Sequence, residues 1–309
     1  MSIFCYLWSP MKAAVVILNW NTRKYLEDFL PGLIESCRGL DSRVYVADSG
    51  STDGSMDYVA GTEAVPMPLG GNFGFTGGYN RALSGLDAEY FVLINSDIEV
   101  PQGWLGPLLD YMDSHPDCGI CGPKLLAWQD RSRFEYAGAA GGYADFFGYP
   151  YCRGRVLKRT APDEGQYDTV KDVLWVSGAC LMIRSGLWKT LGGLDDRFFA
   201  HMEEIDYCWR ARRLGWQVSC IPASTVWHLG GGTLPQGSPF KLKLNFRNSL
   251  LMLANNLPGE IGPESAERRI FFRMVLDGVI ACIYLLTGRR AAFDAVKEAH
   301  KEFKQMQGI

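Results

Sequence analysis

The N-terminal third of the chain alternates short apolar runs with polar, glycine-rich turns. Three runs are rich in β-branched or aromatic residues and lack polar alternation, which is typical of strands buried on both faces of a parallel sheet: 13–18, 44–47 and 90–94. Helices are expected at 22–34, where Pro31 should kink or stop the helix, after 53–54 and at 79–86. This order predicts an α/β fold with a doubly wound, mostly parallel sheet.

Glycine-rich and aromatic segments interrupt this order. Residues 70–78 are expected to form a glycine-rich loop, and 124–172 a long loop. The long loop at 124–172 carries five aromatic residues close together, which either stack on sugar rings or fill a small local core: Tyr143, Phe146, Phe147, Tyr149 and Tyr151. The later pattern predicts a strand at 173–183, a helix at 206–214, a strand at 217–221 before Pro222, and helices beyond Pro258.

Polar side chains gather where the predicted strands end. They are Asn19, Asn21, Asp48, Asn95 and Asp97. Doubly wound sheets bind ligands outside the carboxyl ends of their strands. The sequence therefore predicts a ligand site at this edge.

Two residues are candidate metal ligands. Asp97 ends an apolar strand, where its carboxylate could meet a divalent cation that also binds substrate phosphate; the alternative is a turn cap. His228 precedes a glycine-rich segment and would favour Mn²⁺ over Mg²⁺, unless it is structural.

Three carboxylates, Glu203, Glu204 and Asp206, fall within four residues. If buried, such close charges raise at least one pKa, which suits a general base. The alternative is an acidic first turn of a helix, favoured by the helix dipole.

Composition narrows the class of protein. The net charge of −3 argues against nucleic-acid binding. An odd count of nine cysteines, with no signal peptide pattern in the first residues, favours reduced thiols and a cytoplasmic location. Residues 1–11 are expected to be an extension, and Met11 is an alternative start.

The ordered set of motifs resembles family 2 glycosyltransferases of the GT-A fold, in the rhamnosyltransferase-like branch. The matching stretches are VVILNWN (15–21), ADSGSTDGS (47–55), NFGFTGGYN (72–80), FVLINSD (91–97), VSGACLMIR (176–184), GGLDDRFFAHMEEIDYCWR (192–210) and VWHLGGGT (226–233). The resemblance implies a GT-A domain at 12–258, with a donor-binding half at 12–100 and an acceptor-binding half at 101–258. Residues 259–309 would form a helical tail.

The resemblance also implies a role for each matching residue. Donor-binding positions are Asn19, Trp20, Asn21, Asp48, Asn72, Gly74, Asn80, Asn95 and Ser96, with Trp20 near the base and Asp48 on the pyrimidine ring. Acceptor-binding positions are Trp175, Gly178 and His201. Asp97 and His228 would hold Mn²⁺ or Mg²⁺. Asn95 departs from the family pattern, since many relatives carry Asp there.

For the acids, the resemblance implies that Glu204 is the base, where relatives usually have Asp, and that Glu203 and Asp206 orient it or bind the acceptor. The implied reaction is inverting transfer from a dTDP-, UDP- or GDP-sugar to a saccharide or lipid-linked acceptor in cell-surface polysaccharide assembly. A nucleotidyltransferase and a non-catalytic nucleotide-sugar binding protein are the rival interpretations. A nucleotidyltransferase would carry a glycine-rich, lysine-bearing signature near the first strand, and this sequence has none there. A non-catalytic binding protein would be expected to have lost the acids, and they are present.

The tail from residue 268 is basic, with eight Lys or Arg against four Asp or Glu: 268, 269, 273, 289, 290, 297, 301 and 304, against 277, 294, 298 and 302. Its apolar stretch, 278–287, is short of the ~20 residues that cross a bilayer. The helix would lie on the inner face of the cell membrane, dock on the catalytic domain, or join a second copy in a homo-oligomer.

Overall fold

The computed structural model describes residues 11–157, 159–230 and 238–308, and its centre is a sheet of nine strands within these ranges. The strand order is β11-β13-β6-β12-β4-β1-β2-β3, with β5 paired to β13. The strands are β1 (Met11–Asn19), β2 (Ser42–Asp48), β3 (Val65–Pro68), β4 (Ala88–Ile94), β5 (Ile98–Glu99), β6 (Cys118–Ala127), β11 (Lys171–Asp172), β12 (Cys180–Arg184) and β13 (Gln217–His228).

The N-terminal half of the sheet is parallel, as predicted. Strand β1 pairs in parallel with β2 and β4, and β2 with β3. Strand β12 is antiparallel to both of its neighbours, β4 and β6. The register places Asn19 directly opposite Asp48, so polar residues that end neighbouring strands meet at one edge.

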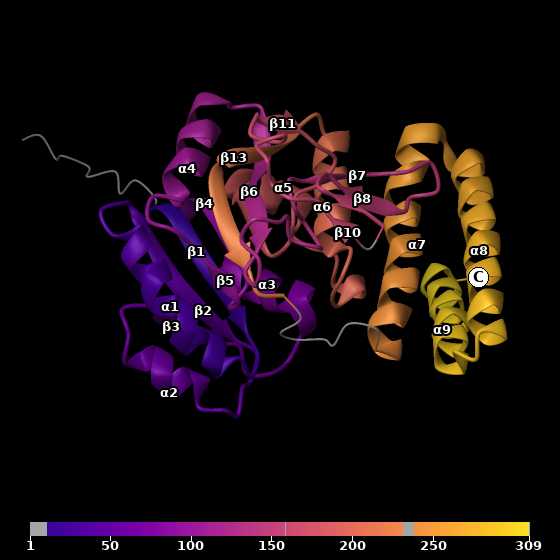
Figure 1. The fold of residues 1–309 in the computed structure, drawn as a ribbon, viewed down its shortest axis with the longest axis horizontal. Helices are drawn as coiled ribbons and strands as arrows, with labels where there is room; N and C mark the ends of the chain where they lie inside the picture. The colour runs from indigo at the N-terminus through magenta and orange to yellow at the C-terminus, as the bar shows by residue number, and fades with distance from the viewer. Residues whose placement is uncertain (1–10, 158, 231–237, 309) are drawn as a thin grey trace, which may run out of the picture.

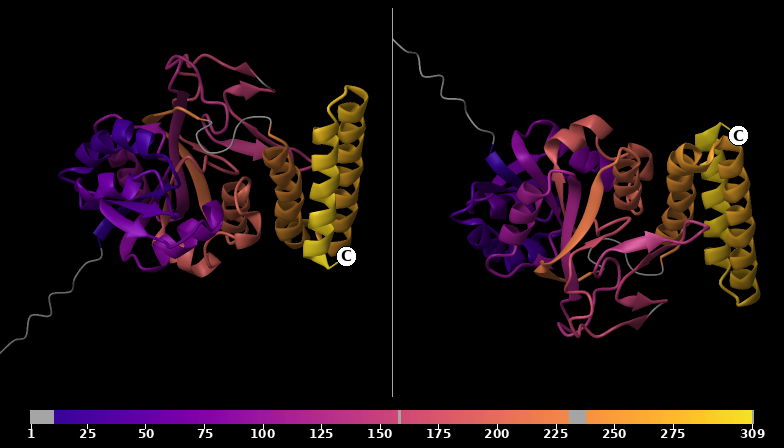
Figure 2. Two further views of the ribbon diagram at one scale, coloured as in Figure 1. Left: turned by 90° about the horizontal axis from the view of Figure 1, so that it is seen from below. Right: turned by 90° about the horizontal axis from the view of Figure 1, so that it is seen from above.

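Helices cover both faces of the sheet (Figures 1 and 2). They are α1 (Arg23–Cys37), α2 (Ser55–Ala60), α3 (Gly74–Ser84), α4 (Leu105–Ser114), α5 (Ser185–Leu191), α6 (Glu203–Arg213), α7 (Pro239–Ile261), α8 (Pro263–Leu286) and α9 (Arg290–Gln307). Alternate residues of β1 supply the two cores: Val15 packs with α1 and α4, and Val16 with α3, α5, α6 and α7.

Several predicted elements need correction. Helix α1 runs past Pro31 to Cys37, so the proline does not stop it. Helix α3 begins at Gly74, inside the expected glycine loop, and α6 begins three residues earlier than predicted. The expected loop at 124–172 begins in strand β6, and only 180–184 of the apolar segment after 173 is a strand. Strand β13 continues beyond Pro222 to His228, through an irregularity between Ile221 and Thr225.

The three C-terminal helices stand together at one end of the molecule (Figure 1). Helix α7 begins at Pro239, so the division expected after residue 258 falls inside it. No helix within the described ranges has the length and apolar character needed to cross a membrane. Two small hairpins lie outside this sheet: β7 (Gly142–Ala144) pairs with β8 (Pro150–Cys152), and β9 (Arg155–Val156) pairs with β10 (Arg159–Thr160).

Candidate functional site

The ends of β1 and β2 form a hydrogen-bonded edge around Asp48. Buried Asn19 donates from Nδ2 to Asp48 Oδ1 at 2.7 Å and to Ser51 Oγ at 3.0 Å. The backbone N–H groups of Gly50 and Ser51 donate to Asp48 Oδ2. A carboxylate has about four acceptor positions, so Asp48 is held in place with capacity left for one more donor.

Two residues after Asn19 the chain turns sharply. Asn21 has left-handed backbone geometry (φ 52°), and its Oδ1 accepts from the backbone of Thr52 at 2.8 Å. Trp20, between them, keeps 42% of its surface exposed. The turn thus leaves the indole of Trp20 partly exposed, next in sequence to the Asn19 that is bonded to Asp48.

Strand β4 is tied to the same edge. The Thr22 hydroxyl lies 2.5 Å from Asn19 Oδ1 and 2.9 Å from Ser96 Oγ. The backbone N–H of Asn95 donates to the carbonyl of Ala179 at 2.9 Å. These contacts connect the Asp48 edge to Asn95 and Ser96, and through Ala179 to the segment that faces helix α6.

Asp97 and His228 are brought into contact by the pairing of β5 with β13. His228 lies opposite Ile98 in this antiparallel pair, and its Nε2 is 3.3 Å from Asp97 Oδ1. Both side chains are buried. These two residues, far apart in sequence, therefore meet in space, and their role as metal ligands stays a prediction.

The second nitrogen of His228 faces a carboxylate that the sequence analysis missed. His228 Nδ1 lies 3.4 Å from Glu135 Oε1, without a well-aligned hydrogen bond. Burial alone lowers the pKa of His228, but Asp97 and Glu135 outweigh it and raise that pKa to about 10. Glu135 lies in an irregular segment, where no motif singled it out.

The donor set of this pair fits a divalent cation. One carboxylate oxygen and one imidazole nitrogen converge, and a cation would bind this nitrogen by displacing the proton that Asp97 and Glu135 stabilise on His228. Mg²⁺ or Mn²⁺ commonly takes one or two protein ligands and completes its shell with phosphate and water. No group of three or more His, Cys, Asp or Glu that could hold a metal occurs in the part of the chain described. Two protein ligands therefore suit a cation that arrives with a substrate diphosphate.

Glu204 is the acid of the 203–206 run that lies against Gly178. It lies in the first turn of α6, partly exposed, against Gly178: a Cβ added at Gly178 would be 3.3 Å from the Glu204 Cβ. Burial raises the pKa of Glu204 to about 7, although hydrogen bonds from nearby backbone N–H groups lower this pKa. A carboxyl with this pKa is half deprotonated near neutrality, which suits a general base.

The other two acids of the run point elsewhere. Asp206 is fully buried, and its oxygens accept from Arg210 at 2.7 Å, Asn255 at 3.0 Å and Asn256 at 2.9 Å. Asp206 therefore joins α6 to α7 instead of facing Glu204. Burial, then the charges of Glu204 and Asp206, raise the pKa of Glu203 well above its usual value, and its Oε2 has no hydrogen-bond partner.

The loop before α6 is held in an unusual backbone conformation. Phe199, His201 and Met202 all have left-handed φ angles, between 65° and 72°. From one side, the backbone N–H groups of Phe75 and Thr76 at the start of α3 donate to the Phe199 carbonyl. Gly74 makes this approach possible, since a Cβ there would meet the Phe199 ring at 2.5 Å.

Helix α7 holds the same loop from the other side. Asn248 Nδ2 lies within hydrogen-bond distance of the carbonyls of Phe198, Ala200 and His201, at 2.7–2.9 Å. Arg247 donates to the Phe198 carbonyl at 2.9 Å and is itself paired with Glu302 of α9 at 3.1 Å. The C-terminal helices thus contribute directly to the geometry of the segment that precedes Glu204.

The remaining predicted donor residues have mainly structural contacts. Asn72 is exposed and caps the Gly74 backbone N–H at 2.9 Å. Asn80 uses both side-chain atoms on the backbone of Leu194 and also donates to Asp196 at 2.8 Å. Asn80 therefore ties α3 to the segment before α6, and both of its amide hydrogens are engaged in these bonds.

The expected acceptor residues separate in the structure. Trp175 is buried, with its indole N–H donated to the Tyr143 carbonyl at 3.0 Å, so it fills core space beside the β7–β8 hairpin. Gly178 and His201 stay beside α6. Burial and nearby Lys241 lower the pKa of His201 to about 4, so its ring is neutral at pH 7.

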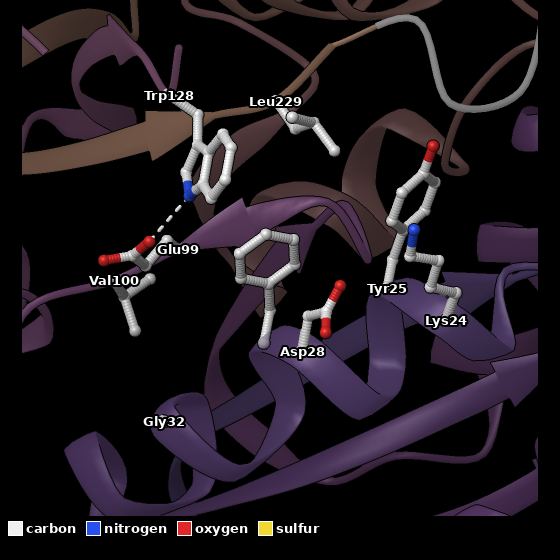
Figure 3. A pocket seen from close by; sticks show the side chains of 9 residues that line it. Lys24, Tyr25, Asp28, Gly32, Glu99, Val100, Trp128 and Leu229 are labelled. Atoms are coloured by element: carbon white, nitrogen blue, oxygen red, sulfur yellow. Dashed lines mark hydrogen bonds between the residues drawn. The ribbon is translucent and has the colours of Figure 1, made fainter. Parts of the chain in front are cut away.

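A pocket of about 510 Å³ adjoins the Asp97–His228 pair (Figure 3). Lys24, Tyr25 and Asp28 of α1 form one wall, and Trp128, whose indole donates to Glu99 at 2.7 Å, forms the other. Glu99 lies two residues after Asp97 in the sequence, and Leu229 directly follows His228. The pocket therefore lies next to the site but contains none of the residues predicted for it.

Residues 14–160 match the family described as glycosyl transferase family 2. This match covers slightly less than half of the chain. The chain is 27% identical over 270 residues to N-acetylglucosaminyl-diphospho-decaprenol L-rhamnosyltransferase of Mycobacterium tuberculosis, covering 79% of the chain and 85% of that protein. The predicted resemblance to the rhamnosyltransferase-like branch is thus confirmed, and the chain is a glycosyltransferase.

Solved structures establish the fold of this glycosyltransferase. It matches GalNAc-T7, solved with UDP, GalNAc and Mn²⁺, with a TM-score of 0.61 and 14% sequence identity. The match covers 80% of the chain described here and 48%, about half, of GalNAc-T7. It matches a mannosyltransferase from Pyrobaculum calidifontis, solved with GDP-Man and Mn²⁺, with a TM-score of 0.58 at 16% identity, over 95% and 74%. The predicted GT-A fold is confirmed.

Proposed function

We propose that this glycosyltransferase transfers a sugar from a nucleoside-diphosphate donor with inversion at the anomeric carbon, using Glu204 as the base and a cation held by Asp97 and His228. The observation that carries the proposal is the position of Glu204. It is the one acid of the 203–206 run that is partly exposed and faces Gly178, and its pKa of about 7 fits proton transfer.

The donor is proposed to lie along the carboxyl edge of the parallel strands. Trp20 offers an exposed face to the nucleobase, and Asp48 offers its remaining acceptor position to a ring N–H. Asn19, Asn21 and Ser96 keep this edge in place through hydrogen bonds. Rhamnose carried on dTDP is the donor proposed first, because the mycobacterial relative is named as an L-rhamnosyltransferase.

Asp97 and His228 would hold Mn²⁺ or Mg²⁺ beside the diphosphate. When bound, the cation neutralises the charge that develops on the leaving diphosphate. Glu135 beside His228 Nδ1 would orient the imidazole so that Nε2 points to the cation. The two related structures solved with Mn²⁺ support a requirement for a divalent cation.

In the transfer step, deprotonated Glu204 takes the proton of an acceptor hydroxyl. That oxygen forms a bond to the anomeric carbon while the bond from this carbon to the diphosphate oxygen breaks. Attack from the face opposite the leaving group inverts the configuration. Gly178, which leaves room for the Glu204 side chain, is proposed to lie beside the acceptor.

The acceptor is proposed to be a saccharide on a lipid diphosphate, in cell-surface polysaccharide assembly. Support comes from the mycobacterial relative, whose name specifies a decaprenol-linked acceptor. The enzyme would then work in the cytoplasm, at the inner face of the membrane. A homo-oligomer is not needed for this proposal.

A donor screen tests the function. The enzyme is incubated with dTDP-rhamnose and several UDP- and GDP-sugars, with Mn²⁺, Mg²⁺ or EDTA, and nucleoside diphosphate release is measured. We expect release from one donor that needs a cation. Calorimetric donor binding without release under any condition would favour a non-catalytic binding protein, and release of pyrophosphate from a sugar phosphate and a nucleoside triphosphate would favour a nucleotidyltransferase.

A further inference from the structure

Helix α8 carries an exposed apolar face, which we call the α8 face. Its members, with exposed fractions from 47% to 86%, are Phe271, Phe272, Val275, Val279, Ile283, Leu285 and Leu286. Sixteen residues of α-helix span about 24 Å, so these side chains form one long strip. Contiguous apolar surface of this kind marks an interaction site.

The α8 face is free of exposed charge along its length. The two charged residues between Phe271 and Leu286 are Arg273 and Asp277, and both are buried and paired with each other at 2.9 Å. Tyr149 and His300 also approach Asp277, at 2.7 and 3.5 Å. Polar groups that would oppose an apolar partner are therefore turned inward, between α8, α9 and the β7–β8 hairpin.

The β7–β8 hairpin is docked on helix α8. Phe146, at the tip between β7 and β8, is 64% exposed, and the guanidinium of Arg269 lies 4.0 Å from its ring centre. Arg273 donates to the Phe147 carbonyl at 3.0 Å, which docks the tip on α8. The aromatic segment noted in the sequence thus divides: Tyr149 is engaged with α8, and Phe146 remains on the surface.

Basic residues stand at both ends of the α8 face. Arg268 and Arg269 precede it and Arg289 and Arg290 follow it, while Glu264 in the first turn of α8 and Glu267 just after that turn are the acids at its N-terminal end. Three of the four acids between residues 268 and 309 are already paired, Asp277 with Arg273 and both Glu298 and Glu302 with Lys243. The remaining surface of the tail is therefore positive.

We propose that the α8 face lies flat on the surface of an anionic lipid bilayer, with its apolar strip in the acyl boundary and its terminal arginines on headgroup phosphates. An in-plane helix combines these same two features. Helix α8 is on the outer side of the three C-terminal helices in both views of Figure 2, where a broad surface can reach it. This inference rests on the proposed lipid-linked acceptor and identifies the part of the chain that meets the lipid.

Vesicle co-sedimentation of the full chain tests the inference, with vesicles of phosphatidylcholine alone or with about one third phosphatidylglycerol. We expect binding to anionic vesicles that falls roughly tenfold or more in the Phe271→Asp/Leu286→Asp variant, since binding scales with apolar area. Leu157→Asp, an 88% exposed leucine outside the tail, is the matched control and should bind normally. Arg289→Glu/Arg290→Glu should remove the preference for anionic vesicles.

Three outcomes would overturn the inference. They are absent binding by the natural chain, unchanged binding by the Phe271→Asp/Leu286→Asp variant, and a stable dimer in gel filtration that this variant dissociates, which would assign the face to a second copy. Transfer to a free saccharide acceptor should be unchanged in the variant. Vesicle binding needs no substrate, so its failure is distinct from failure of the proposed reaction.

Discussion

The side-chain amide of Asn248 donates to the main-chain carbonyl of His201 at 2.8 Å, three residues before Glu204. The same amide nitrogen lies within reach of two further carbonyls of this loop. Left-handed φ angles at non-glycine residues cost about 1–3 kcal/mol each and persist only where the surroundings enforce them. A helix from the C-terminal part of the chain therefore enforces the conformation of the loop that carries the proposed base.

Replacing Asn248 by Ala should lower kcat roughly tenfold or more while the donor KM changes little, because small displacements of a catalytic group are costly. The pH dependence of kcat should also shift, since the burial of Glu204 depends on this loop. Asn255→Ala is the matched control: it removes bonds from the same helix to Asp206, Asp195 and Arg197 but leaves the three contacts of Asn248 to the loop carbonyls intact. Equal losses in both variants, with an unchanged pH profile, would reduce Asn248 to a general stabilising role.

Replacing Glu204 by Gln should lower kcat by about 10²–10⁴-fold, which is the usual contribution of a general base. Donor affinity, measured by calorimetry, should stay within a few-fold, because the base acts on the acceptor. Glu203→Gln serves as the comparison. Near-normal turnover in Glu204→Gln would transfer the role of base to another group.

The pH dependence follows from the raised pKa of Glu204. A base must be deprotonated to act, so kcat/KM should rise with pH up to about 7 and level off above it. Below that pH the rate should fall about tenfold per unit, as the carboxylate is protonated. The rise should disappear in Glu204→Gln, measured under the same metal concentration; a midpoint near 4.5 in the natural enzyme would contradict the assignment.

Removal of Glu135 tests the proposed metal pair indirectly. Glu135→Gln keeps the size of the side chain but removes the charge that faces His228 Nδ1. The concentration of Mn²⁺ for half-maximal activity should rise roughly 10- to 100-fold, as for other partners of metal-bound histidines. Turnover at saturating Mn²⁺ should recover. An unchanged metal requirement would remove Glu135 from the site.

The part of the site that the sequence predicted lies at strand ends. Parallel strands place their last residues at one edge, so the sequence alone groups Asn19, Asp48 and Asn95. The Asp97–His228 contact depends on the antiparallel pairing of a two-residue strand, and only the family resemblance indicated it.

Other features depend on tertiary contacts that leave no periodic signal. Gly74 begins a helix although it lies in a glycine-rich segment, because the α3 N-terminus is held by the Phe199 carbonyl. Glu135 and Asn248 act through single contacts to residues far along the chain. Glu203 and Glu204 fall on different sides of α6. The sequence could not separate them, because it predicted a helix that begins only at residue 206.

The sharing of one apolar cluster between the sheet and helix α7 has a consequence for how the protein melts. Leu250, Leu251 and Leu253 pack with Val16 of β1 and Ile205 of α6, and Phe303 of α9 joins them. Elements that bury each other's surface lose their stability together, so heat should produce one calorimetric peak, not an early peak for the C-terminal helices followed by a late one for the sheet.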